Sequence, residues 1–241
     1  MKKIILNQKS YLLYDEMVEF KKEFDKIKLN DYEFILFPQV CYLSMFNNAK
    51  YPVGAQNFYR TKTASFTGEI NLQTLSSMNI NYTLIGHYER KKLIGETKEF
   101  TKEKLFRSLN SKFNTILCVG ETKKTNRPFL YIKKDLTYYL KSIEKKNLKY
   151  LSIVYEPNWA IGTGEIQCTD KILKTIDQIK QYMKKRYNLN VEVYYGGSID
   201  NNNIKDILEL CDGVLLGKAS ASIKEIKELI EEIKWLLWTT Y

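Results

Sequence analysis

The chain has 241 residues, of which 44% are hydrophobic and 27% are charged, and its formal net charge is +10. This balance is typical of globular proteins and excludes a disordered chain. No apolar run is long enough to span a membrane, and the apolar run after Lys3 is too short for the core of a signal peptide. A basic surface can attract polyanions or small anionic substrates, but the lysines are spread along the whole chain, which favours ordinary solvated helix faces.

Short apolar runs recur along the chain and are separated by segments with helical spacing of apolar residues. The clearest predicted helix covers residues 170–187, where Ile172, Ile176 and Met183 share one face. Hardly any predicted strand alternates between apolar and polar residues, as expected of parallel strands covered on both faces. The eight predicted strands are residues 4–6, 34–37, 53–56, 82–85, 115–119, 151–155, 191–195 and 213–216.

Eight strands alternating with helices predict an α/β fold with parallel β-α units. A doubly wound sheet and a closed (β/α)8 barrel both fit this order. The number of units and the chain length favour the barrel, as a single domain over residues 1–241. We find no linker that would divide the chain.

Polar residues and glycines follow the carboxyl ends of five predicted strands. In a parallel barrel these ends meet on one face, where active sites are built. The five segments therefore predict a single site. Its candidate residues, in chain order, are Asn7, Lys9, Gly86, His87, Glu89, Glu156, Gly196, Gly197, Ser198 and Gly217.

Glu156 ends the sixth predicted strand, and a lid-like sequence follows it. Pro157 interrupts the strand because it has no N–H to donate. Trp159 can exclude water, and Gly162 and Gly164 can approach a ligand closely. A salt-bridged carboxylate is the alternative, but the hinge-like sequence favours a general base.

His87 and Lys9 are the other candidates for chemistry. A lone histidine is often structural, yet His87 directly follows a strand, which favours an electrophilic or acid–base role. Lysines are abundant in this chain, so a lysine alone is weak evidence of function. The case for Lys9 depends on Asn7, two residues earlier, whose side chain points to the same side if the strand continues.

Two glycine-containing segments, 196–198 and 216–220, each end a strand and begin a helix in the last two units. Both could be plain turns. Free N–H groups at the start of a helix bind anions, however, and the loops after strands 7 and 8 often hold phosphate in such barrels.

The four cysteines form no C-x-x-C pair, and a single histidine does not complete a metal site. We expect Cys41, Cys118, Cys168 and Cys211 to be reduced packing residues of a cytoplasmic protein. The segment 235–238 contains two tryptophans and is interpreted as the apolar face of the last helix rather than a partner or membrane contact.

Taken in order, these motifs resemble the triosephosphate isomerase family over nearly the whole chain. That family is the standard illustration of paired acid–base roles and lid closure, so the roles below are the family's. The segments that carry the resemblance are 7–9, 54–57, 65–69, 85–87, 118–121, 155–157, 159–164, 195–198 and 212–213.

The resemblance implies a glycolytic and gluconeogenic isomerase that interconverts dihydroxyacetone phosphate and D-glyceraldehyde 3-phosphate through an enediolate, without a metal or organic cofactor. Glu156 would remove the proton next to the carbonyl, and neutral His87 would polarise the carbonyl. Lys9 would stabilise the enediolate and hold the phosphate. The other implied site residues are Asn7 for positioning, Glu89 to orient Lys9, and the backbone amides of Gly162, Ser198, Gly217 and Lys218 to hold the phosphate.

The resemblance also implies a homodimer formed through the 58–69 loop, with Thr67 near the active site of the other subunit. No nucleic acid or membrane partner is expected. Two alternatives remain open: a phosphate-binding barrel enzyme with a larger sugar or indole substrate, and a non-catalytic barrel that binds polyanions or a protein partner.

Four positions depart from the family pattern without removing a catalytic group. Gln8 replaces the usual tryptophan. Tyr88 replaces the serine after the histidine, so its ring must find space near Glu156 or at the dimer face. Asn158 replaces an apolar hinge residue, and Lys218 replaces the second glycine of a phosphate loop.

Overall fold

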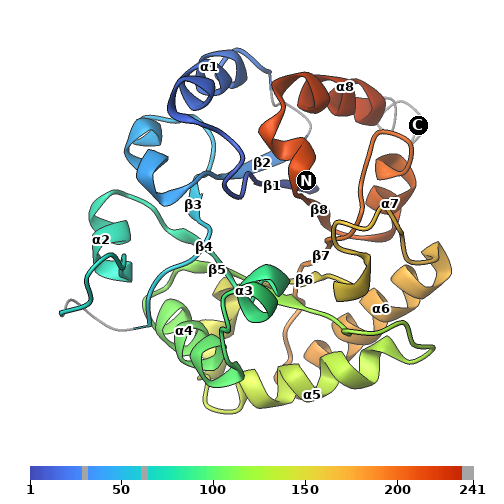
Figure 1. Ribbon diagram of the computed structural model, residues 1–241. Helices are drawn as coiled ribbons and strands as arrows, with labels where there is room; N and C mark the ends of the chain where they lie inside the picture. The colour runs from blue at the N-terminus through green and yellow to red at the C-terminus, as the bar shows by residue number, and fades with distance from the viewer. Residues whose placement is uncertain (29–31, 61–64, 235–241) are drawn as a thin grey trace.

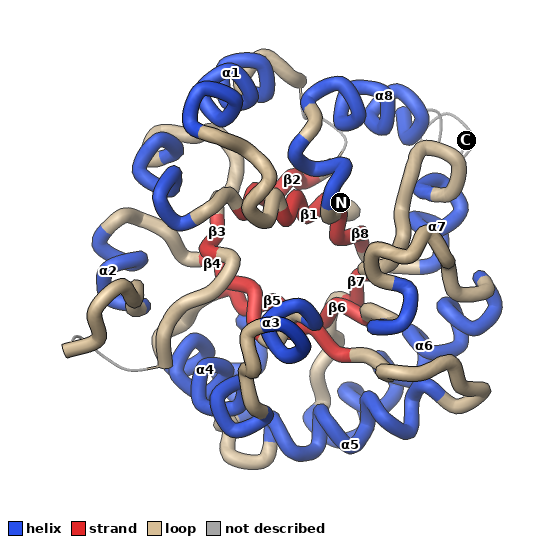
Figure 2. Tube along the Cα trace, in the orientation of Figure 1, coloured by secondary structure: helices blue, strands red, loops and turns tan. Residues whose placement is uncertain are grey.

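The computed structural model describes residues 1–28, 32–60 and 65–234. Its strands form a ring that is surrounded by helices (Figure 1, Figure 2). The ring has the order β2-β1-β8-β7-β6-β5-β4-β3, and the paired strands are parallel. A parallel bridge between Leu36 and Val53 joins β2 to β3 and closes the ring. The predicted (β/α)8 barrel is therefore confirmed, and the doubly wound alternative is wrong.

The element bounds match the predicted pattern of strand followed by helix. The strands are β1 (Lys3–Asn7), β2 (Glu33–Phe37), β3 (Gly54–Ala55), β4 (Tyr82–Ile85), β5 (Asn114–Val119), β6 (Leu151–Tyr155), β7 (Val193–Tyr195) and β8 (Gly213–Leu216). The α-helices are α1 (Tyr14–Phe24), α2 (Leu72–Ser77), α3 (Tyr88–Leu93), α4 (Lys98–Asn110), α5 (Pro128–Leu140), α6 (Thr169–Tyr187), α7 (Ile204–Leu210) and α8 (Ile223–Lys234). Short 3-10 helices are η1 (Val40–Phe46), η2 (Lys145–Tyr150), η3 (Asn158–Ala160) and η4 (Lys218–Ala221).

Two strands are shorter than the sequence predicts. Strand β3 comprises only Gly54 and Ala55, and Val53 before it forms an isolated bridge to Leu36. Strand β7 begins only at Val193, because the Val193 N–H donates to the carboxylate of Asp212 at 2.7 Å instead of to a neighbouring strand.

Alternate residues of each strand face the inside of the barrel or the surrounding helices. Ile5 and Val154 lie in the cluster inside the barrel, whereas Ile4 and Leu6 pack against the helices. The same alternation turns Asn7 and Glu156 toward the inside, at the carboxyl-terminal mouth. The whole inner cluster is Ile5, Ile35, Phe37, Leu84, Ile116, Cys118, Val154, Tyr194 and Leu215.

The long helix α6 confirms the predicted helix at 170–187. It buries Ile172, Ile176 and Met183 on one face. It ends at Asn188, whose φ of 56° is the left-handed conformation that commonly terminates helices.

The cysteine prediction is only half right. Cys118 and Cys211 are buried, but Cys41 and Cys168 are exposed and do not pack. Cys41 lies on η1, which turns Leu43 and Phe46 to the core instead, and Cys168 stands outside the first turn of α6.

No described helix is both long and apolar enough to cross a membrane, and no described group of His, Cys, Asp and Glu side chains could hold a metal ion. The tryptophans of segment 235–238 lie outside the described residues, so the prediction about them stays untested.

Candidate active site

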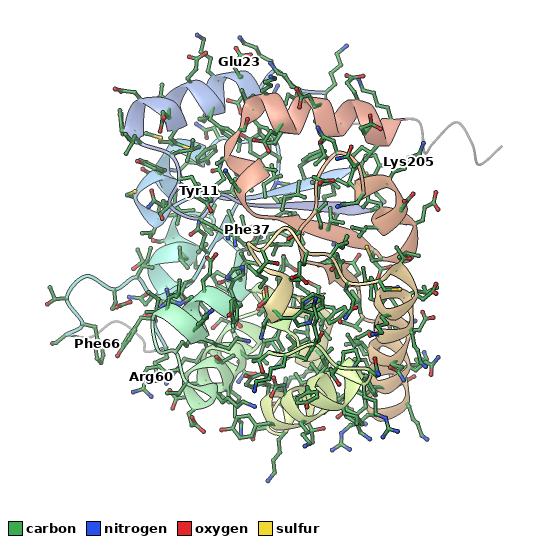
Figure 3. The ribbon with its side chains drawn as sticks, turned by 45° about the vertical axis from the view of Figure 1, so that its right-hand side comes forward. Tyr11, Glu23, Phe37, Arg60, Phe66 and Lys205 are labelled. Atoms are coloured by element: carbon green, nitrogen blue, oxygen red, sulfur yellow. The ribbon has the colours of Figure 1, made fainter. Side chains whose placement is uncertain are left out.

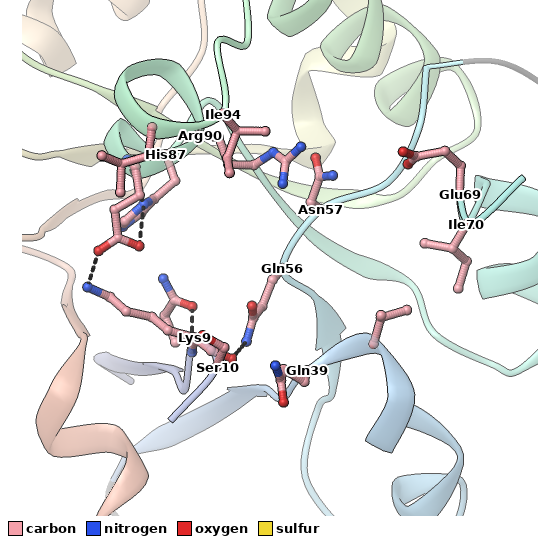
Figure 4. Close-up of a pocket in the computed structure, with 15 residues that line it drawn as sticks. Lys9, Ser10, Gln39, Gln56, Asn57, Glu69, Ile70, His87, Arg90 and Ile94 are labelled. Carbon is pink, nitrogen blue, oxygen red and sulfur yellow. Dashed lines mark hydrogen bonds and ion pairs between the residues drawn. The ribbon is translucent and has the colours of Figure 1, made fainter. Parts of the chain in front are cut away.

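A pocket of about 650 Å³ lies at the carboxyl-terminal mouth of the barrel (Figure 4). Four predicted site residues line it: Asn7, Lys9, His87 and Glu89. The other predicted residues lie outside its lining. The remaining lining residues are Ser10, Gln39, Val40, Gln56, Asn57, Gly68, Glu69, Ile70, Arg90, Leu93 and Ile94.

Lys9 has a left-handed backbone, with a φ of 51°, which is sparsely populated for residues other than glycine. Its ammonium pairs with the carboxylate of Glu89, and its N–H donates to Asn7 Oδ1 at 3.4 Å. The predicted contact between Glu89 and Lys9 is therefore present. A conformation of this kind persists only where its surroundings hold it.

Gln56 helps to hold this conformation, although it is not among the predicted site residues. Its Nε2 donates to the Lys9 carbonyl at 2.8 Å (Figure 4). The same atom donates to the Phe37 carbonyl at 2.9 Å. Gln56 directly follows β3, so its position at a carboxyl strand end was the signal that could have identified it.

His87 is buried at the junction of β4 and α3. The Glu89 N–H donates to His87 Nδ1 at 3.4 Å, so Nδ1 is the acceptor of the ring. A neutral imidazole that accepts at Nδ1 carries its proton at Nε2. His87 Nε2 lies 3.7 Å from Glu156 Oε2, so the two side chains stand side by side.

Glu156 is 1% exposed, and its Oε1 accepts the Tyr88 N–H at 2.8 Å. The Tyr88 ring was expected to need space near Glu156 or at the dimer face. It is the Tyr88 backbone that contacts Glu156, while the Tyr88 ring lies 5.2 Å from the ammonium of Lys92.

The end of β5 packs closely against the backbone of Glu156. A side chain at position 120 would come within 1.8 Å of the Glu156 carbonyl, so only glycine fits there. The Glu156 N–H donates to the Val119 carbonyl at 2.9 Å. Burial, and then the Glu156 carboxylate, raise the pKa of the Cys118 thiol well above its usual range, so this neighbour stays neutral.

Glu121 ties the predicted lid to β5. It is buried, and its Oε1 accepts from Trp159 Nε1 at 2.9 Å and from the Tyr155 hydroxyl at 3.3 Å. The Asn158 N–H donates to the Glu121 carbonyl at 3.0 Å. The lid hinge is thus bonded to the strand next to the one that carries Glu156.

Asn158 is the departure from the family pattern that the hinge buries. Its Nδ2 donates to the Gly120 carbonyl at 3.4 Å, and its Oδ1 has no hydrogen-bond partner among the described residues. Beyond it, Gly162 and Gly164 have φ values of 71° and 77° and are exposed.

The contribution of the Glu121 carboxyl to the free energy of unfolding depends on pH. Burial raises its pKa, and the bonds from Trp159 and Tyr155 oppose that shift only in part. A carboxyl with a raised folded pKa contributes stability below its unfolded value of about 4.3, and this is lost as pH rises through the folded pKa.

We therefore expect Glu121→Gln to gain stability relative to the unsubstituted protein as the pH rises from 4 to 8, by about 1.4 kcal/mol for each unit of pKa shift removed. Urea denaturation of both proteins at several pH values measures this difference. A difference that stays constant with pH would contradict the assignment.

Among the remaining predicted residues, Ser198 and Gly217 contact other parts of the site. Ser198 Oγ donates to the Ala160 carbonyl of the lid at 2.9 Å. Gly217 lies beneath Lys9, because a side chain there would meet Lys9 Cε at 3.3 Å. Gly162 and Lys218 are exposed, on the lid and at the start of η4.

A buried ionic network that was not predicted from the sequence lies behind the pocket. Lys104 Nζ lies 2.5 Å from Glu96 Oε2, and both side chains are 4% exposed. Arg90 Nε donates to Glu96 at 2.8 Å, and Lys104 reaches Asn57 at 2.6 Å. Burial alone would raise the pKa of Glu96, but Lys104 and Arg90 outweigh it and hold that pKa below its usual value. The network links two lining residues of the pocket, Arg90 and Asn57.

Comparisons with known proteins agree with this geometry. The family model described as triosephosphate isomerase matches residues 2–233. The chain is 35% identical over 236 residues to the triosephosphate isomerase of Aster yellows witches'-broom phytoplasma, covering 91% of this chain and 85% of the relative. It is also 38% identical over 181 residues to the enzyme of Mycoplasma genitalium, covering 73% of each chain. A third match, to the Campylobacter concisus enzyme, is 39% identical over 170 residues and covers 70% of this chain and 71% of that one.

Proposed function

This chain belongs to the triosephosphate isomerase family, and we propose that Glu156, His87 and Lys9 carry out its reaction. The reaction is the interconversion of dihydroxyacetone phosphate and D-glyceraldehyde 3-phosphate, a step of glycolysis. The family membership favours this enzyme over the other phosphate-binding barrel enzyme and over the non-catalytic barrel.

Glu156 acts as the base in this proposal. Its carboxylate takes a proton from the carbon next to the carbonyl and returns it to the neighbouring carbon, so the substrate is isomerised without net gain or loss of atoms. His87 donates from Nε2 to the carbonyl oxygen and moves protons between the two oxygens. The Lys9 ammonium offsets the negative charge of the enediolate and also holds the phosphate, and Asn7 helps to place the substrate.

One observation carries the assignment: His87 accepts the Glu89 N–H at Nδ1 and therefore presents a proton at Nε2, 3.7 Å from the Glu156 carboxylate. The direct test supplies D-glyceraldehyde 3-phosphate to the purified protein and couples the product ketone to an NADH-dependent reductase. Absence of turnover from folded protein would contradict the proposal, and a panel of larger sugar phosphates separates the alternative enzyme.

We further propose that the amides of Gly162, Ser198, Gly217 and Lys218 hold the phosphate. The bond from Ser198 to the lid and the position of Gly217 beneath Lys9 support this arrangement. An enediolate next to a phosphate must be shielded from water, and a lid that closes on the phosphate would do so.

The Lys218 ammonium is an addition that glycine cannot make. We expect Lys218→Gly to weaken inhibition by inorganic phosphate about 5-fold, as for the loss of one modest charge-assisted contact. The measurement is the inhibition constant of phosphate for both proteins. Equal constants would mean that the ammonium points into solvent and that only the backbone of residue 218 is used.

We propose a homodimer formed through the 58–69 loop, with Thr67 reaching the other subunit. The described part of this region projects from the barrel at Phe66 (Figure 3). Leu93 and Ile94, which line the pocket, are 70% and 65% exposed, and exposed apolar side chains beside a pocket are typical of interaction surfaces.

We expect sedimentation of the unsubstituted protein to show a two-chain species. Ile94→Lys should shift it to monomers with about 10-fold lower activity, because a charge would be buried without a partner at the interface. Leu130→Lys makes the same change on α5, away from this surface, and should leave the dimer intact. A monomeric unsubstituted protein with full activity would contradict the proposal.

We also propose that residues 1–241 form one domain and that the protein acts in the cytoplasm. The family model spans 2–233, which supports the single domain. The four cysteines are free thiols, which suits a reducing compartment.

A further inference from the structure

Gln8 lies between Asn7 and Lys9 and is 1% exposed. Its N–H donates to the Phe37 carbonyl at 3.2 Å, which fixes the chain just after β1. The position departs from the family pattern described above, where an apolar aromatic residue is usual. A buried polar side chain at such a place must be accounted for by its contacts.

The Gln8 side chain crosses to the turn that follows β8. Its Nε2 donates to the Ser220 carbonyl at 3.3 Å. That turn is itself closed, because the Ser220 N–H and hydroxyl both donate to the Gly217 carbonyl, at 2.9 and 2.5 Å. Gln8 is therefore bonded to a segment of fixed shape, and this segment contains two of the four proposed phosphate-binding amides, those of Gly217 and Lys218.

Lys9 contacts the same turn from the next position in the chain. A side chain at Gly217 would lie 3.3 Å from Lys9 Cε and 3.4 Å from Lys9 Nζ, so the lysine stem passes directly over this glycine. On its other side, Lys9 is held by Glu89 and Gln56 (Figure 4). Within the described residues, the hydrogen bond from the Gln8 side chain to the Ser220 carbonyl joins the segment that carries Lys9 to this turn.

The Gln8 amide also has an unfavourable feature. Its Oε1 is buried and has no hydrogen-bond partner among the described residues. A buried acceptor without a partner lowers stability. An apolar side chain of similar length would avoid this penalty, so the amide is hard to explain by stability alone.

We propose that Gln8 is a positioning residue that sets the distance between the Lys9 ammonium and the phosphate-binding turn at residues 217–220. The inference rests on the proposed role of Lys9. Gln8 does not touch the substrate; it acts by keeping two substrate-binding segments in register. Its loss would loosen the grip on the phosphate while leaving the fold intact.

The test compares Gln8→Met, Lys9→Met and the double variant. Methionine keeps the length of the glutamine and removes both polar atoms. The readouts are the dissociation constant of inorganic phosphate, followed by phosphorus NMR, the kcat/KM for glyceraldehyde 3-phosphate, and the melting temperature. Gln181→Met, an exposed change on α6, is the matched control.

We expect Gln8→Met to weaken phosphate binding and kcat/KM about 5-fold each, the effect of one lost hydrogen bond, with an unchanged or higher melting temperature. Lys9→Met should weaken phosphate binding about 10-fold, because the bond lost is charge-assisted. In the Lys9→Met background, Gln8→Met should have no further effect, because it acts through Lys9. The control should match the unsubstituted protein in all three readouts.

Three results would overturn the inference. If Gln8→Met binds phosphate normally while Lys9→Met does not, Gln8 has no positioning role and the proposed role of Lys9 stands. If Lys9→Met itself binds phosphate normally, both assignments fail. If Gln8→Met weakens binding equally in both backgrounds, or lowers the melting temperature together with the affinity, its role is structural.

Discussion

Replacing Glu156 with aspartate will lower kcat by at least ~10²-fold, because removing one methylene withdraws the carboxylate by about 1 Å from the carbon that it must deprotonate. The structure leaves little room for compensation. The Glu156 backbone is fixed by its bond to the Val119 carbonyl and by the close approach of Gly120, so the main chain cannot advance to restore the distance.

Steady-state kinetics in both directions measure this effect. KM should change much less than kcat, since the carboxylate contacts the reacting carbon and not the phosphate. Glu209→Asp makes the same change on the exposed surface of α7 and should have no effect. An unchanged kcat in Glu156→Asp would mean that another group is the base.

The second large effect is expected for His87→Gln, which should lower kcat by ~10²–10⁴-fold, the range that general acid–base catalysis supplies. A glutamine amide can still donate a hydrogen bond to the carbonyl oxygen. It cannot give up and regain a proton, so the transfer between the two substrate oxygens loses its carrier.

Isotope exchange distinguishes this failure from the loss of Glu156. In deuterated water, His87→Gln should still exchange the substrate proton at the carbon, because Glu156 is intact, while isomerisation is slow. Glu156→Asp should lose exchange and isomerisation together. Normal isomerisation by His87→Gln would exclude His87 from the chemistry.

Much of the fold could be predicted because each strand is a short, continuously apolar run bounded by polar residues. The errors are local and have local causes. Strand β3 covers only Gly54 and Ala55, with Val53 in an isolated bridge, and the Asp212 carboxylate takes the Val193 N–H at the start of β7. Asp212 lies nineteen residues from Val193 in the chain, so the periodicity of apolar residues does not reveal this hydrogen bond.

The site was predictable to the extent that residues at carboxyl strand ends converge. This rule placed Lys9, His87 and Glu89 in one pocket, but it was not applied to Gln56, which obeys it. The orientations of side chains were not predictable. Neither the Tyr88 ring beside Lys92 nor the bond from Gln8 to Ser220 follows from the sequence, because each depends on how separate segments pack.

The burial of the Glu96 network behind the pocket determines how the site responds to ionic strength. Exposed ion pairs are screened within about 8 Å at physiological salt, whereas buried pairs are screened much less. The pair of Lys104 and Glu96 is almost fully buried, so added salt should leave the bonds that hold Arg90 and Asn57 unchanged. The same salt weakens the attraction of the anionic substrate to the basic protein surface. Rising salt would then slow the capture of substrate without altering the shape of the site that receives it.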